Sequence, residues 1–151
     1  ADDGIRASVA SRGLGDVYKR QVFEAFSYTV PASGEEVKSF VIAGSGEAQE
    51  APGDYAERII RLDESTAEAM EEKAVYVLNT MEARMDALGV GWADVGTSQV
   101  YTVHDLYPFF ESQIVGRGAA EAGLTWYYAR PPVTGLDYEM DVRSVPVERV
   151  I

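Results

Sequence analysis

The segment 126–143 constrains the fold most, because its second half alternates strictly between apolar and charged side chains. Such alternation predicts a β-strand with one face toward the protein interior. The apolar positions are Tyr138, Met140 and Val142, and the charged positions are Asp137, Glu139, Asp141 and Arg143. The charged face is a poor surface for a covering helix, so we expect it to meet water, a ligand or another subunit.

A two-residue turn is predicted at Thr134-Gly135, between strands at 125–133 and 137–145. Counting outward from that turn places Arg130 directly opposite Glu139, with Cβ atoms about 5 Å apart. A guanidinium can hold a carboxylate ligand through two parallel hydrogen bonds, and a nearby glutamate can move a proton. The alternative interpretation of this pair is an ordinary cross-strand salt bridge.

Composition excludes several classes of function. The chain has 151 residues, no cysteine and one histidine, so it has no thiolate nucleophile and no Cys-based or poly-His metal site. Its net charge of −12 disfavours nucleic acid as a partner. No apolar run approaches the ~20 residues of a membrane span. No signal-peptide pattern is present at the start, so we expect a cytoplasmic protein.

The remaining pattern predicts the element order β-β-α-β-α-β-β. Further strands are expected at 22–30, 38–44 and 97–104, and helices at 65–88 and 107–117. The first helix has apolar residues at three- and four-residue spacing, Asp63 or Ser65 as its cap, and Gly89 at its end. Its methionines are expected to fill the core. This order fits an α+β fold with two helices on one face of a mixed sheet.

Two segments stand apart from this pattern. Residues 1–21 are rich in Gly and Ala and carry a cluster of basic residues, and residues 13–21 resemble adapter-derived sequence at the start of unrelated metagenomic translations. We therefore expect a dispensable leader at 1–21 and a single domain at 22–151. Residues 44–64 form a long loop, which is either functional or disordered.

From residue 22 to about 147 the chain resembles the Rid family of enamine/imine deaminases, also called the YjgF or L-PSP family. The matching segments are 26–28, 40–44, 78–79, 87–89 and 100–106, followed by Arg130 and 139–141. The resemblance implies a chorismate-mutase-like fold and a homotrimer with clefts at the subunit interfaces. It also implies hydrolysis of a reactive 2-imino or 2-enamino acid to a 2-keto acid and ammonia, without a cofactor or metal.

The resemblance also assigns roles to particular residues. Arg130 would hold the substrate carboxylate, and Glu139 would position the attacking water. The implied cleft is lined by Phe26 (usually a tyrosine in the family), Ala43, Gly44, Gln113 and Pro132.

One departure from the family pattern bears on catalysis. Pro131-Pro132 stands where the deaminase subgroup has a serine and a cysteine, so two backbone N–H donors are absent, although the Pro132 carbonyl can still accept from water. Carboxylate binding is therefore better supported than catalysis.

Three functions compete on this basis. The first is an enzyme that deaminates an imino or enamino acid, and the second is a non-catalytic trimer that binds a small carboxylate. The third, a ribonuclease or translation inhibitor, is disfavoured by the acidic charge. His104, the one imidazole, is either a general base or, more simply, the partner in a structural hydrogen bond at a strand end.

Overall fold

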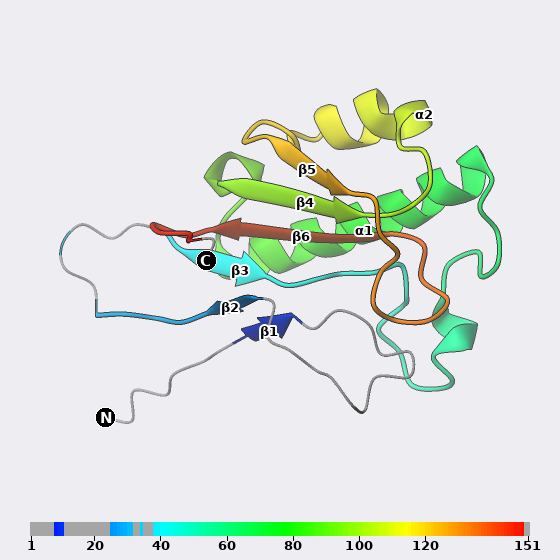
Figure 1. Cartoon of the computed structure of the whole chain (residues 1–151), viewed down its shortest axis with the longest axis horizontal. Coiled ribbons are helices and arrows are strands. Elements are labelled where there is room, and N and C mark those ends of the chain that lie inside the picture. The colour runs from blue at the N-terminus through cyan, green and yellow to red at the C-terminus, as the bar shows by residue number, and fades with distance from the viewer. Residues whose placement is uncertain (1–7, 11–24, 32–33, 35–37, 150–151) are drawn as a thin grey trace.

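A four-stranded mixed sheet forms the centre of the protein (Figure 1). The structure is a computed structural model, and it describes residues 8–10, 25–31, 34 and 38–149. The sheet has the order β3-β6-β4-β5, where the strands are β3 (Phe40–Ile42), β4 (Thr97–Tyr101), β5 (Leu124–Tyr127) and β6 (Glu139–Ser144). β6 is antiparallel to both of its neighbours, whereas β4 and β5 are parallel.

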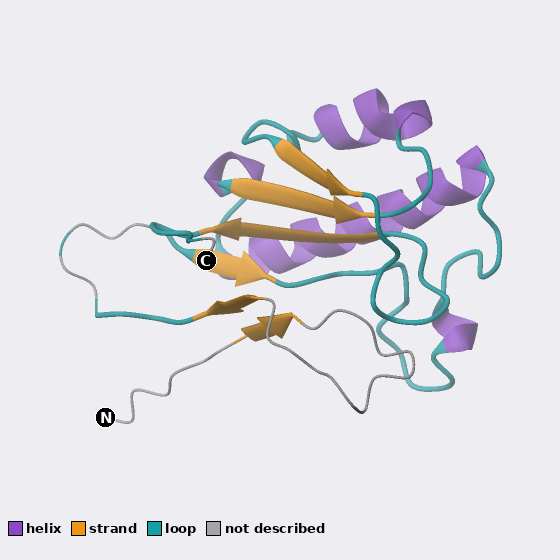
Figure 2. Ribbon diagram, viewed as in Figure 1, coloured by secondary structure: helices purple, strands orange, loops and turns teal. Residues whose placement is uncertain are grey.

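The helix α1 and the helical segment that begins with α2 pack together on one face of this sheet (Figure 2). The helix α1 (Ala67–Leu88) contacts β3 and β6. The short α2 (Tyr107–Phe109) continues into a π-helical turn at Phe110–Val115, and both contact α1. The α+β class predicted from the sequence is therefore confirmed. Among the described residues, no helix has the length and apolar character needed to cross a membrane.

The helix α1 forms where the apolar stripe predicts it. Its methionines Met70, Met81 and Met85 are all buried, as expected. The predicted cap was wrong by one residue, because Thr66 accepts a hydrogen bond from the Ala69 N–H (3.2 Å). Gly89 ends the helix in the left-handed conformation (φ 68°), which glycine adopts without a steric penalty.

The alternating strand also forms as predicted. Met140 and Val142 point into the core and are fully buried, and burying such a side chain contributes roughly 1.5–3 kcal/mol. Glu139, Asp141 and Arg143 lie on the other face, away from the helices, and are half-buried. Asp137 lies two residues before β6 begins and is buried, so its placement on that outer face was wrong.

The predicted hairpin of the last two strands is wrong, although its turn exists. The Leu136 N–H donates to the Val133 carbonyl (3.2 Å), and Gly135 has φ 91°, so the turn lies at Thr134-Gly135. However, β4 lies between β5 and β6, and β5 ends at Tyr127. Two consecutive prolines follow Arg130 and cannot donate ladder hydrogen bonds, so the chain leaves the sheet as a loop over 128–138.

A separate two-stranded ladder joins β1 (Ser8–Ala10) and β2 (Ala25–Ser27), with Val9 paired to Phe26. β1 lies within the segment that we expect to be dispensable, and that expectation remains a prediction. The parts of the predicted strand at 22–24 lie outside the described residues.

Candidate active site

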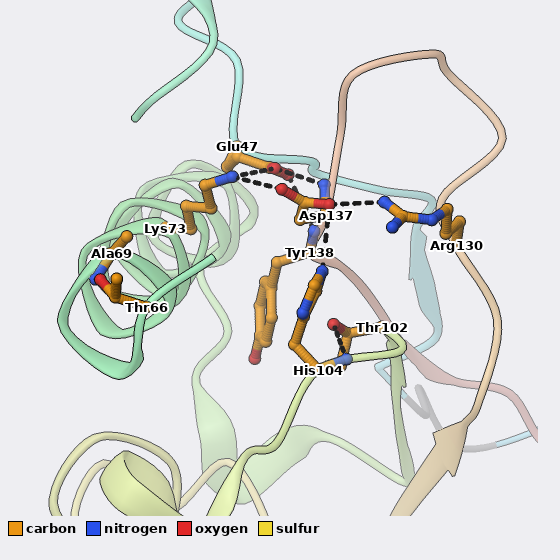
Figure 3. Close-up of polar contacts among 9 residues, drawn as sticks. All are labelled: Glu47, Thr66, Ala69, Lys73, Thr102, His104, Arg130, Asp137 and Tyr138. Atoms are coloured by element: carbon orange, nitrogen blue, oxygen red, sulfur yellow. Dashed lines mark hydrogen bonds and ion pairs between the residues drawn. The ribbon is translucent and has the colours of Figure 1, made fainter. Parts of the chain in front are cut away.

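Asp137 lies at the centre of a cluster of charged side chains at one end of the sheet (Figure 3). Its Oδ2 accepts from Lys73 Nζ at 2.6 Å, and its Oδ1 lies 2.7 Å from Arg130 Nη1 and 3.2 Å from His104 Nε2. These partners come from α1, from the loop over 128–138 and from the segment after β4. The carboxylate therefore joins three parts of the chain that are distant in sequence.

Glu47 completes the cluster from the long loop over 44–64. Its two carboxylate oxygens accept from the backbone N–H groups of Asp137 (2.5 Å) and Tyr138 (3.0 Å). Its Oε1 also lies 3.5 Å from Lys73 Nζ, and both side chains are fully buried. The predicted loop is thus an ordered part of the structure that places a carboxylate in the protein interior.

A close backbone approach holds this loop against β6. Gly46 pairs with Glu139 in an isolated antiparallel bridge, and the Met140 N–H donates to the Ser45 carbonyl at 3.0 Å. A Cβ at Gly46 would lie only 2.5 Å from Leu136 Cδ1, so any larger residue here would force the buried Leu136 side chain to shift. In the same loop, an isolated antiparallel bridge pairs Ala48 with Ile59.

The charges of the cluster balance. Glu47 and Asp137 supply two negative charges, and Lys73 and Arg130 supply two positive charges. Burial raises the pKa of Glu47, although the backbone hydrogen bonds and Lys73 act in the opposite direction. Burial also opposes ionisation of Asp137, but Lys73, with a contribution from His104, holds the pKa of its carboxyl below the ordinary value. The contact with Lys73 therefore favours the ionised form of Asp137.

The cluster runs from the core to the surface. Lys73 is fully buried, the side chain of Asp137 is 10% exposed, and that of Arg130 is 63% exposed. Arg130 uses only Nη1 for Asp137, and within the described residues its Nε and Nη2 have no hydrogen-bond partner. The guanidinium therefore keeps donors free for a ligand.

Glu139 lies on the outer face of the sheet, where β6 begins. Burial, with the negative charges of Asp141 and Glu47, raises the pKa of Glu139 to about 7. It forms no ion pair with any described cation. A Cβ added to Gly44 would lie 3.6 Å from Glu139 Oε1, so the backbone of that loop passes close beside the carboxylate. A carboxyl with this pKa can donate or accept a proton near neutral pH.

Polar and aromatic side chains continue across the outer face beside Glu139. Tyr101 is its register partner on β4, and the Tyr101 ring stacks on Tyr127 of β5 with centroids 5.1 Å apart. The Tyr101 hydroxyl lies 2.9 Å from Asp141 Oδ2, and Arg143 Nη1 lies 3.2 Å from Asp141 Oδ1. This face therefore offers stacking surfaces and hydrogen-bonding groups next to a titrating carboxyl.

The structure changes the predicted relation between Arg130 and Glu139. They are not cross-strand partners, because Glu139 pairs with Tyr101 on β4 and Arg130 lies in a loop. The predicted salt bridge exists with a different acid, Asp137, two residues before Glu139 in the sequence. His104 makes a side-chain contact with that same acid, which agrees with its simpler interpretation as a hydrogen-bonding residue.

The other predicted site residues are scattered. Gly44 lies beside Glu139, and Pro132 is half-buried in the loop that carries Arg130. Ala43 lines an open depression of about 360 Å³ between β3 and α1, together with Arg84. The Gln113 amide donates to Glu71 Oε1 (3.1 Å), outside the Asp137 cluster. The backbone of Phe26 lies in β2, but its side chain is outside the described residues.

The sequence patterns did not identify Glu47, Lys73 and Asp137 as one cluster. One signal was present, because Lys73 interrupts the apolar stripe of α1 next to Ala74. A lysine in such a stripe predicts a buried cation, which in turn requires a buried counter-charge. No local pattern identifies which carboxylates of the chain supply that charge.

Residues 6–149 match the protein family described as 2-aminomuconate deaminase CnbZ. The chain belongs to that family. A 2-amino-5-chloromuconate deaminase from Comamonas testosteroni is 43% identical over 128 residues, which cover 84% of this chain and 51% of that protein. The chain thus spans about half the length of the curated relative that it matches. The resemblance to the Rid group of deaminases is confirmed by these matches.

Two solved structures resemble the fold more distantly. One is a Thermotoga maritima protein described as a candidate endoribonuclease, with a TM-score of 0.47 and 18% identity over 72% of this chain and 79% of that chain. The other is a Mycobacterium tuberculosis member of the YjgF/YER057c/UK114 family, with a TM-score of 0.39 and 18% identity over 69% of this chain and 75% of that chain.

Proposed function

We propose that this protein hydrolyses the C–N bond of a 2-aminomuconate-type substrate, a conjugated six-carbon dicarboxylate with an amino group at C2. The products are the corresponding 2-keto acid and ammonia. Membership of the 2-aminomuconate deaminase family supports the substrate class. The 43% identity to a 2-amino-5-chloromuconate deaminase also supports it, although that protein is about twice as long as the matched segment.

The observation that carries the proposal is the environment of Glu139. Its carboxyl is half-buried on a face that the helices leave open, and its pKa is raised to about 7. At neutral pH such a group is present in both protonation states, so it can give a proton in one step and take one in the next. The neighbouring rings of Tyr101 and Tyr127 offer a flat surface for a conjugated chain.

The reaction requires proton transfer and water addition, without redox chemistry. Glu139 protonates a carbon of the conjugated enamine, which gives an iminium at C2. Water then adds to C2 while the Glu139 carboxylate takes a proton from it. Glu139, now protonated, gives its proton to the carbinolamine nitrogen, the C–N bond breaks, and the Glu139 carboxylate takes the proton of the carbinolamine hydroxyl. This releases ammonia, leaves a C2 carbonyl and returns Glu139 to its protonated form. No cofactor is needed, because an iminium carbon is already electrophilic.

The two carboxylates of the substrate require positive partners. Arg130 is proposed to hold the C1 carboxylate, because its guanidinium has donors left after the contact with Asp137. Arg84 approaches from α1, where its Nη1 donates to the Gly44 carbonyl (3.1 Å) beside Glu139. Its Nη2 pairs with Glu50, so Arg84 is proposed to hold the distal carboxylate in place of Glu50.

Ammonia release from 2-aminomuconate, with the loss of its ultraviolet absorbance, tests the proposal. Glu139→Gln should lower kcat by about 100-fold or more, the size expected for loss of a general acid–base group. Glu111→Gln, on an exposed position of the π-helical turn, is the matched control and should keep wild-type activity.

The KM for 2-aminomuconate tests the proposed role of Arg130 as the substrate anchor. Arg130→Ala should raise the KM strongly, and Arg130→Lys should restore it poorly, because an ammonium cannot reproduce the planar fork of donors. If the wild-type protein binds muconate but releases no ammonia, the protein is a carboxylate-binding protein without catalysis. If it does neither, the proposed function is wrong.

A further inference from the structure

We propose that Asp137 is a positioning residue that fixes the orientation of the Arg130 guanidinium for the substrate carboxylate. This inference rests on the proposed role of Arg130 as the substrate anchor. The affinity of Arg130 for the substrate carboxylate would then depend on Asp137, a carboxylate of the protein that does not lie on the outer face of the sheet.

Arg130 needs such a partner because few other contacts restrict its side chain. The residue lies in the loop over 128–138, its side chain is 63% exposed, and its one described hydrogen bond is the contact from Nη1 to Asp137 Oδ1 (2.7 Å). An exposed arginine has many accessible rotamers, and losing them on ligand binding opposes affinity. A contact that already restricts the guanidinium removes part of that loss.

Asp137 is suited to this role because it is itself fixed from the interior. Its Oδ2 accepts from the fully buried Lys73 (2.6 Å), and its backbone N–H donates to the buried Glu47 (2.5 Å). Three consecutive contacts therefore connect the core to the guanidinium: Glu47 with Lys73, Lys73 with Asp137, and Asp137 with Arg130. Figure 3 shows this series running from α1 toward the loop.

The monodentate geometry leaves room for the ligand. A bidentate pair with Asp137 would occupy two donors of the guanidinium, but Oδ2 is engaged by Lys73 and only Oδ1 faces Arg130. His104 Nε2 approaches the same Oδ1 at 3.2 Å, which further limits how Arg130 can approach. The Nε and Nη2 donors of Arg130 therefore remain available to a substrate carboxylate.

A double-mutant cycle on muconate binding tests the inference. Muconate has the proposed carbon skeleton and both carboxylates but no amino group, so its Kd from calorimetry is independent of turnover. Asp137→Asn should weaken muconate binding roughly tenfold, the size expected for groups that share one hydrogen-bond network. In the Arg130→Ala background the same change should have almost no effect. Asp94→Asn, which removes a carboxylate paired with the exposed Lys38, is the matched control.

Kinetics with 2-aminomuconate give a second readout. Asp137→Asn should raise KM and leave kcat within about twofold, whereas Glu139→Gln should lower kcat. If Asp137→Asn weakens muconate binding equally with and without Arg130, or lowers kcat without changing KM, the positioning role is wrong. If Asp137→Asn does not fold, the triple variant Glu47→Gln/Lys73→Met/Asp137→Asn removes the three buried charges together and takes its place in the cycle. Wild-type protein that neither binds muconate nor releases ammonia would instead refute the proposed function.

Discussion

Replacing Lys73 with methionine is the sharpest test of the buried charge cluster. The substitution keeps most of the length of the side chain but leaves Glu47 and Asp137 without the cation that lies between them. Removing one partner of a buried ion pair destabilises a protein by about 3–5 kcal/mol, because the remaining charge stays in a poorly solvated site. For a protein of this size each kcal/mol shifts Tm by about 2–4 °C, so we expect a loss of about 10 °C.

The pH dependence of that loss gives a second measurement. Without Lys73, the pKa of Glu47, which burial already raises, should rise further in the folded state, and the lowered pKa of Asp137 should rise. The ionised form of Glu47 then opposes folding more strongly than in the wild type. The penalty is full above the folded pKa and disappears as pH falls through it and the carboxyls become protonated. Calorimetry between pH 8 and pH 5 should therefore show the Tm of Lys73→Met approaching that of the wild type.

Lys38→Met is the matched control for this experiment. Lys38 also pairs with one carboxylate, Asp94, but its side chain is 59% exposed. Exposed ion pairs contribute little to stability, so the Tm of this variant should be close to that of the wild type. Equal and small effects from both substitutions would refute the view that Lys73 is a buried, structurally required cation.

Three further predictions follow from the site and the assembly. The kcat of the deaminase reaction should change around pH 7, because the pKa of Glu139 is about 7. The raised pKa also means that the ionised Glu139 carboxyl opposes folding. Thermal melts should therefore show that Glu139→Gln raises Tm above pH 7 but not below pH 5. Gly46→Ala should lower Tm, because its Cβ would displace Leu136, whereas Gly91→Ala has open space and serves as its control. Light scattering should give about three times the chain mass of 16.5 kDa if the homotrimer implied by the Rid resemblance forms, and a monomer mass would refute it.

The sequence predicts well where local pattern and burial agree. The apolar stripe of α1 repeats with the period of an α-helix, and the alternation of β6 repeats with the period of a β-strand. The buried positions of Met81 and Met140 therefore follow directly from these patterns. Gly89 likewise ends its helix in the conformation that its residue type predicts. These features depend on neighbours within a few residues, which is the information that a sequence pattern contains.

Strand pairing and the charge cluster depend on contacts that no local pattern encodes. The turn at Thr134-Gly135 exists, yet the strands on either side are separated by β4, which arrives from about 40 residues earlier in the chain. Asp137 continues the alternating pattern of β6 in the sequence, but the strand begins only at Glu139. The carboxylate of Asp137 therefore does not lie on the outer face and instead contacts Lys73. Charge pairing in the interior decided that orientation.

The position of β6 in the sheet has a consequence for how the chain reaches its folded state. β6 is the last of the described strands along the chain, yet it occupies an interior position between β3 and β4. Until residues 139–144 have been synthesised, β3 has no partner in this sheet and β4 lacks one of its two. Unpaired strand edges favour association between chains. Nascent or truncated chains that end before residue 139 should therefore depend on chaperones more than the folded domain does.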